Sequence, residues 1–216
     1  LGLQTILNLF LQVCDAVAYA HNQLVIHRDL KPANIFVDNN GQVKLLDFGI
    51  AKLLDTETVH LTQTQVFTPE YAAPEQINGE ACSTTTDIYA LGILLFELLV
   101  GEKRFGMSDM SMVDKIKAIT QPTTVFASQI MGQRKLKNAA KAKGAVDTII
   151  NKSMHFDDKR RYQSVYELIS DIKRFQQNLP IKAMGDGWFY RFSMLIKRHT
   201  WSSLLAFLLF VSLSVG

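Results

Sequence analysis

The chain has 216 residues, of which 48% are hydrophobic, and its 23 Lys and Arg against 20 Asp and Glu give a formal net charge of +3. These values exclude an intrinsically disordered chain and fit one substantial folded domain. The small charge excess does not by itself demand a nucleic-acid partner. Two cysteines, Cys14 and Cys82, argue against a disulfide framework and are typical of a reducing compartment.

The first predicted element is an amphipathic helix. Apolar residues recur there at steps of three and four, the period of a helix with one buried face. The stripe consists of Leu3, Ile6, Leu7, Phe10, Cys14, Val17 and Ala18. Because Cys14 lies on the stripe, we expect its thiol to be buried in packing rather than redox-active.

The next segment, His27-Arg28-Asp29-Leu30-Lys31-Pro32-Ala33-Asn34, carries the residue types that in-line phosphoryl transfer requires. Asp29 is the candidate base for the proton of an acceptor hydroxyl. Lys31 would bring a compact positive charge to the transferred phosphoryl group. Asn34 and the later Asp47 supply hard oxygen ligands of the kind that Mg²⁺ prefers. The spacing therefore indicates an ATP and Mg²⁺ site.

Two short apolar runs follow, at residues 34–37 and 43–46, with Asp38-Asn39-Asn40-Gly41 between them. This pattern predicts a β-hairpin with a tight turn. The hairpin would bring Asn34 and Asp47 close together.

Residues 49–75 are polar and rich in threonine, without a convincing period, and we interpret them as a loop. A phosphate on Thr62 or Thr64 would find cationic partners in Arg28 and Lys52. The alternative is that these threonines fill an exposed loop and carry no regulation.

Residues 91–100 are apolar nearly all round and end at Gly101, which predicts a helix buried in the core and too short to span a bilayer. Residues 133–143 are basic. Because no aromatic residues interleave these charges, a solvated helix face or loop is favoured over a nucleic-acid patch. The basic residues are Arg134, Lys135, Lys137, Lys141 and Lys143.

The carboxyl end is rich in aromatic and basic residues up to His199, and residues 201–216 then contain no charge. This pattern predicts a basic juxtamembrane segment at 181–199 and a truncated transmembrane helix at 200–216. Cations before the span place residues 1–180 in the cytoplasm, on a single-pass protein of the cytoplasmic membrane. The alternative is an apolar helix docked on the folded domain.

Taken together, the motifs resemble those of protein kinases. The HRDLKPAN segment is followed by Asp47-Phe48-Gly49, then by Ala73-Pro74-Glu75, Asp87-Ile88-Tyr89-Ala90-Leu91-Gly92 and Arg161-Tyr162. With the basic juxtamembrane stretch, the pattern is similar to membrane-anchored bacterial serine/threonine kinases of eukaryotic (Hanks) type. The resemblance covers residues 1–180 and implies an α+β fold, a mainly helical carboxyl-terminal lobe with a short β-hairpin near the catalytic loop.

The resemblance also implies structural roles. His27 would orient the catalytic loop rather than shuttle protons, and Asp87 would underpin that loop from a helix. Thr68 would hydrogen-bond the base Asp29 and Lys31. The presence of Lys31 and Thr68 together favours serine and threonine over tyrosine as acceptors. Glu75 and Arg161 would form a buried ion pair. The other histidines, including His21, show no metal-ligand spacing and are expected to be solvated or locally bonded.

No glycine-rich loop and no strand lysine precede His27, so we expect a fragment of a longer product that transfers phosphate poorly by itself. Within the full product, the expected partners are proteins with serine or threonine acceptors, a membrane, and a second copy during phosphorylation in trans, with no nucleic acid. The alternative is a membrane-tethered pseudokinase that binds partners without catalysis.

Overall fold

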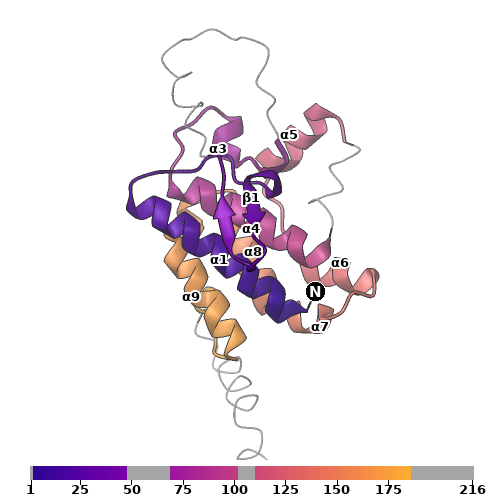
Figure 1. The fold of residues 1–216 in the computed structure, drawn as a ribbon. Coiled ribbons are helices and arrows are strands. Elements are labelled where there is room, and N and C mark those ends of the chain that lie inside the picture. The colour runs from indigo at the N-terminus through magenta and orange to yellow at the C-terminus, as the bar shows by residue number, and fades with distance from the viewer. Residues whose placement is uncertain (1, 48–68, 102–109, 186–216) are drawn as a thin grey trace, which may run out of the picture.

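The computed structural model describes residues 2–47, 69–101 and 110–185. The described chain is mostly helical with one two-stranded antiparallel sheet, which confirms the expected class at that level (Figure 1). Its longer elements are α1 (Leu3–Asn22), β1 (Ile35–Val37), β2 (Val43–Leu45), α3 (Pro74–Ile77), α4 (Thr84–Val100), α5 (Met112–Thr120), α6 (Ala127–Gln133), α7 (Ala139–Ala142), α8 (Ala145–Ser153) and α9 (Val165–Gln176). Short 3₁₀ turns are η1 (Pro32–Asn34), η3 (Pro69–Tyr71), η5 (Asp158–Arg160) and η6 (Lys182–Met184).

Helix α4 is the centre of the core. Its side chains are buried on nearly every face, as the apolar run 91–100 predicted, because α1, α6 and α8 all pack against it. Ser83 caps the start of α4 by accepting the backbone N–H of Thr85. Gly101 ends the helix with φ +75°, a left-handed conformation that glycine adopts without strain.

Helix α1 carries the predicted amphipathic stripe and lies against α4, α9 and the hairpin. Phe10, Cys14 and Val17 are fully buried, and burial raises the pKa of the Cys14 thiol well above its ordinary value. Within the described ranges, α1 is also the helix whose length and composition would suffice to cross a bilayer, but half of its apolar stretch is buried inside the lobe. Core packing accounts for that composition.

The close approach of α8 to α4 depends on Gly92. A Cβ at this position would lie 2.6 Å from Cγ of Met154 and 2.7 Å from Cβ of Ser153. Both neighbours are buried, so neither has room to retreat. Gly92 thereby allows the two helices to pack closely at the centre of the lobe.

The hairpin pairs Ile35 with Leu45 and Val37 with Val43. Gln12 of α1 holds the hairpin to the lobe, because its side chain accepts the N–H of Val43 at 3.1 Å and donates to the carbonyl of Gly41 at 3.3 Å. Residues 38–41 form the predicted turn.

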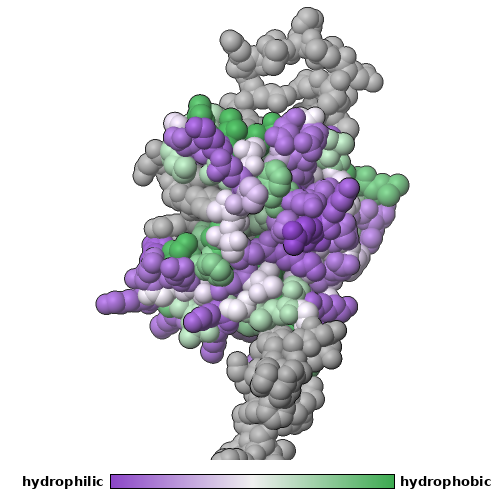
Figure 2. Space-filling view, turned by 180° about the vertical axis from the view of Figure 1, so that it is seen from behind, coloured by the Kyte–Doolittle hydropathy of each residue, from purple (hydrophilic) through white to green (hydrophobic). Residues whose placement is uncertain are grey.

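Two apolar side chains of β1 are partly uncovered, Phe36 at 52% and Val37 at 46% exposure, and because they are consecutive they point to opposite faces of the hairpin. Viewed from behind, in contrast, the described surface is largely hydrophilic (Figure 2). Apolar side chains are also exposed elsewhere, among them Leu24 at 94% and Val113 at 60%.

Candidate active site

The catalytic-loop candidate follows α1 and is anchored on Asp87 in the first turn of α4. Oδ2 of Asp87 accepts the backbone N–H of His27 at 2.8 Å, and Oδ1 accepts that of Arg28 at 2.8 Å. Asp87 is 1% exposed, so these bonds form out of water. A buried carboxylate with two oxygens thus fixes two consecutive peptide groups of the loop.

Arg28 adopts φ +66°, in the left-handed region that a side chain with a Cβ rarely occupies. Besides Asp87, the side chain of Gln76 in α3 stabilises this turn by donating to the carbonyl of Arg28 at 2.8 Å. Arg28 Nε is buried and has no hydrogen-bond partner among the described residues.

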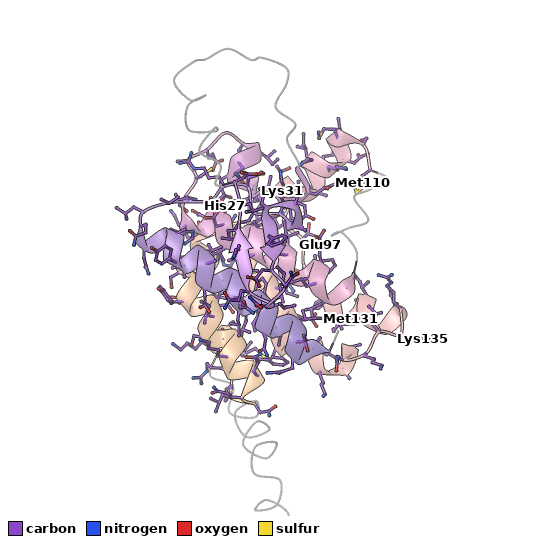
Figure 3. The ribbon with its side chains drawn as sticks, viewed as in Figure 1. His27, Lys31, Glu97, Met110, Met131 and Lys135 are labelled. Atoms are coloured by element: carbon purple, nitrogen blue, oxygen red, sulfur yellow. The ribbon has the colours of Figure 1, made fainter. Side chains whose placement is uncertain are left out.

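The carboxylate of Asp29 collects two polar neighbours from its own loop. Nζ of Lys31 lies 2.8 Å from Oδ2 of Asp29, and Nδ2 of Asn34 donates to the same oxygen at 3.2 Å and to the Asp29 carbonyl at 2.9 Å. The Asp29 and Lys31 side chains remain 26% and 23% exposed, open to an approaching molecule. Two of the candidate residues, Lys31 and Asn34, therefore converge on the Asp29 carboxylate. Figure 3 shows His27 and Lys31 at the same end of the folded domain.

The hairpin brings Asp47 to this cluster. Asn34 lies immediately before β1, and its carbonyl accepts the N–H of Leu46 at 2.9 Å. Asp47 is the residue after Leu46, so this bond holds the backbone of Asp47 near Asn34. Asp47 is exposed and has φ +49°. Next to it, Nε2 of His27 lies 3.2 Å from the Leu46 carbonyl, which ties the fully buried His27 ring to the end of the hairpin.

The residues suit a magnesium–nucleotide site. Asn34 uses its amide nitrogen to bind Asp29, and the structure gives its amide oxygen no hydrogen bond within the described residues. Within the described parts of the chain, no three His, Cys, Asp or Glu side chains gather as a complete metal cage. One amide and one carboxylate are the sparse donor set that Mg²⁺ uses when phosphates and water complete its shell.

Glu75 of α3 and Arg161, which follows η5, form an ion pair. The guanidinium donates to both Glu75 oxygens at 2.8 Å and uses its other donors on the carbonyls of Thr85, His155 and Phe156. Burial by itself would raise the pKa of Glu75, but the hydrogen bonds and charge of Arg161 outweigh it and hold the pKa below its ordinary value. Removing one partner of such a buried pair typically costs about 3–5 kcal/mol.

His21 is a residue whose position the sequence reasoning missed. We expected a solvated or locally bonded side chain, but Nε2 of His21 lies 2.8 Å from Oδ2 of Asp87, 66 residues away. The side chain is 10% exposed. His21 stands in the last turn of α1, so the helix end and the loop that begins at His27 meet the same carboxylate, and no local pattern in the sequence signals this contact.

The remaining candidates fall partly outside the structure. Thr62, Thr64 and Thr68 lie outside the described residues, as does the predicted transmembrane segment 200–216. Just after the undescribed stretch, the Tyr71 hydroxyl donates to Glu97 of α4 at 2.7 Å. The end of the threonine-rich segment is therefore fixed to the same helix that holds the catalytic loop.

The sequence of this chain is similar to the sequences of known proteins. The family model for the protein kinase domain matches residues 2–172. The chain is 36% identical over 168 residues to the serine/threonine-protein kinase PrkC of Bacillus subtilis, 32% over 175 residues to the probable serine/threonine-protein kinase PknB of Corynebacterium glutamicum, and 32% over 222 residues to the serine/threonine-protein kinase PknD of Protochlamydia amoebophila. These alignments cover 77%, 79% and 90% of this chain and 24%, 26% and 22% of the respective relatives. The chain thus spans about a quarter of the length of these relatives.

Proposed function

Because this chain belongs to the protein kinase family, we propose that residues 1–180 form the carboxyl-terminal lobe of a serine/threonine kinase that phosphorylates proteins. The observation that carries the proposal is the convergence of Lys31 and Asn34 on the Asp29 carboxylate. The exposed Phe36 and Val37 of the hairpin support the assignment to this lobe, because apolar side chains next to such a site are often covered by another part of a folded domain.

In the proposed reaction, Asp29 accepts the proton of a serine or threonine hydroxyl as the acceptor oxygen bonds to the γ-phosphorus of ATP, while the bond from that phosphorus to the β–γ bridging oxygen breaks and ADP leaves. Asn34 restrains the Asp29 carboxylate through its Nδ2 bond and so aims it at the acceptor. Lys31 lies beside the same oxygen, where its ammonium balances the negative charge of the phosphoryl group. Asn34 and Asp47 would hold Mg²⁺, which together with ATP supplies the phosphoryl donor and neutralises its oxygens.

A second part of the proposal is control by phosphorylation of Thr62 or Thr64. The buried Nε of Arg28, which has no partner among the described residues, supports this because a phosphate offers three strong acceptor oxygens. Thr68 would position the acceptor near Asp29 and Lys31. Phosphorylation in trans would involve a transient pair of copies.

We also propose that the protein is anchored in the cytoplasmic membrane through residues 200–216 and signals from there. The uncharged run 201–216 supports this, as does the basic segment before it. The protein substrate would then be reached on the cytoplasmic side.

The experiment that tests this function is phosphoamino-acid analysis of the full-length protein after incubation with γ-labelled ATP, Mg²⁺ and a generic protein substrate. We expect label in phosphoserine and phosphothreonine. Label in phosphotyrosine would contradict the assigned acceptor class. No transfer by folded, nucleotide-binding protein would contradict the activity and favour a docking role instead.

A further inference from the structure

Lysines gather at the end of the lobe that lies away from the catalytic loop. Lys135 projects from the loop between α6 and α7, far from His27 and Lys31 (Figure 3). The exposed lysines of this region, here named the basal lysines, are Lys135, Lys137, Lys141, Lys143 and Lys182.

The basal lysines are not neutralised by neighbouring acids. None of them has an ion pair among the described residues. Asp147 and Asp171 are the nearby carboxylates in sequence, and they are 4% and 0% exposed. The carboxylate oxygens of both residues accept hydrogen bonds from groups of the folded domain. Residues 2–14 of α1, which also reach this end, carry no charge at all.

A hollow of about 830 Å³ places part of this surface beside the end of the described chain. Lys141 and Lys143 line the hollow on one side, and Leu179 and Met184 line it on another. The residues that continue toward the predicted membrane segment therefore start next to the basal lysines.

This exit point is firmly attached to the lobe. Asp171 accepts the backbone N–H of Lys182 at 2.7 Å and of Ala183 at 2.9 Å, and it also accepts the Tyr162 hydroxyl at 3.0 Å. Ile181 is 1% exposed. Because these bonds fix residues 181–183, the direction in which the chain leaves is set by the folded lobe rather than by a free linker.

We propose that the basal lysines bind the anionic headgroups of the membrane and orient the lobe with its catalytic loop away from the bilayer. This inference rests on the proposed membrane anchoring through residues 200–216. Lysine clusters close to a membrane are attracted to anionic lipids within about one Debye length, ~8–10 Å at ordinary salt. No aromatic residue lies among the lysines of residues 135–143, so the surface suits lipid headgroups better than the stacking bases of a nucleic acid.

The test uses the full-length protein reconstituted in two kinds of vesicle, phosphatidylcholine alone and phosphatidylcholine mixed with phosphatidylglycerol, each carrying a headgroup nitroxide quencher. A fluorophore is attached through Ala140→Cys, an exposed site among the basal lysines, in a background in which Cys82 and every cysteine outside residues 1–216 are replaced by serine. Cys14 is fully buried with a raised pKa and should stay unlabelled. We expect quenching at least about twofold stronger in the anionic vesicles.

Two matched variants make the result specific. Lys141→Gln with Lys143→Gln should clearly weaken the quenching in anionic vesicles, although Lys135, Lys137 and Lys182 remain. Raising the salt to about 0.5 M should reduce the quenching to the level seen in neutral vesicles. The control is Lys159→Gln with Arg160→Gln, which removes two exposed cations in η5, next to Arg161 and its partner Glu75 of α3. This variant should leave quenching unchanged. Equal quenching in both vesicles, or no response to the lysine substitutions, would overturn the inference.

Flotation of the vesicles separates this inference from membrane anchoring. If the protein floats with both vesicle types but is quenched equally in both, membrane anchoring is supported and lipid binding by the basal lysines is overturned. If the protein floats with neither vesicle type, both membrane anchoring and lipid binding by the basal lysines are overturned. Single-stranded RNA can be added to the labelled protein in detergent. If the anisotropy of the fluorophore then rises, and quenching does not depend on the lipid, the surface binds nucleic acid and the inference is overturned.

Discussion

Oδ1 of Asp87 accepts the backbone N–H of Arg28 at 2.8 Å, although the two residues are 59 positions apart. Arg28 is in the left-handed region, which costs a residue with a Cβ roughly 1–2 kcal/mol. The bond from Asp87 offsets this cost, and its other oxygen holds His27 in the same way. The conformation of the loop that carries Asp29 thus depends on a carboxylate in α4.

Asp87→Asn should therefore impair both stability and catalysis. Asparagine keeps one acceptor oxygen, so its NH₂ group must face one of the two backbone N–H groups. We expect a loss of about 1–3 kcal/mol in the free energy of unfolding and a lower kcat. Thermal unfolding and steady-state kinetics of the full-length protein measure these effects, with the exposed Asp114→Asn as the control. A kcat equal to that of the control would contradict the anchoring role.

His21 should stabilise the same carboxylate by hydrogen bonding. His21→Phe keeps an aromatic ring at this position but removes Nε2, which lies 2.8 Å from Oδ2 of Asp87. We expect this change to destabilise the protein by about 1–2 kcal/mol. His21→Gln retains an N–H donor and should recover part of that loss. If the two variants have the same melting temperature, the hydrogen bond of His21 contributes nothing.

The depressed pKa of Glu75 predicts a specific dependence of stability on acid. A carboxyl whose folded pKa lies below its unfolded value stabilises the fold above the unfolded pKa, about 4.3 for Glu. That contribution is lost as the pH falls through the lower, folded pKa. Glu75→Gln should be less stable at pH 7, because Arg161 loses its counter-ion, and should lose less stability on acidification. Urea unfolding across this range tests it, and equal acid sensitivity of the two proteins would refute it.

Gly92→Ala should disturb the packing of α4 on α8. The new methyl group would lie within 2.7 Å of side-chain atoms of Ser153 and Met154, so we expect a loss of about 1–3 kcal/mol in stability. Gly132→Ala is the matched control, since a Cβ there meets nothing within 4 Å. Melting temperatures of the two variants should differ by several degrees, whereas equal values would show that the helices can separate without cost.

Features that depend on short stretches of sequence were predictable. The stripe through Leu7 and Phe10 predicted α1, and the run to Gly101 predicted a buried helix. The turn at residues 38–41 predicted the hairpin. In each case the period or turn chemistry of neighbouring residues decides the local structure.

Contacts between distant segments could not be predicted from such patterns. His21 gave no sign of Asp87, and Gln76 gave no sign that it holds the carbonyl of Arg28, because both contacts require the packing of α3 and α4. The positive φ of Arg28 was equally hidden, since nothing in an arginine favours it. The roles of Thr62, Thr64 and Thr68 stay predictions.

The most direct measurement is the rate of γ-phosphate transfer from ATP with Mg²⁺ by the full-length protein, comparing Asp29→Asn with Asp38→Asn. Both variants exchange a carboxylate for an amide, but Asp38 lies in the hairpin turn and Asp29 carries the contacts of Lys31 and Asn34. We expect Asp29→Asn to lower kcat by about 10²–10⁴-fold and Asp38→Asn to leave it near the wild-type value. Transfer by Asp29→Asn at the wild-type rate would contradict the assignment of Asp29 as the base.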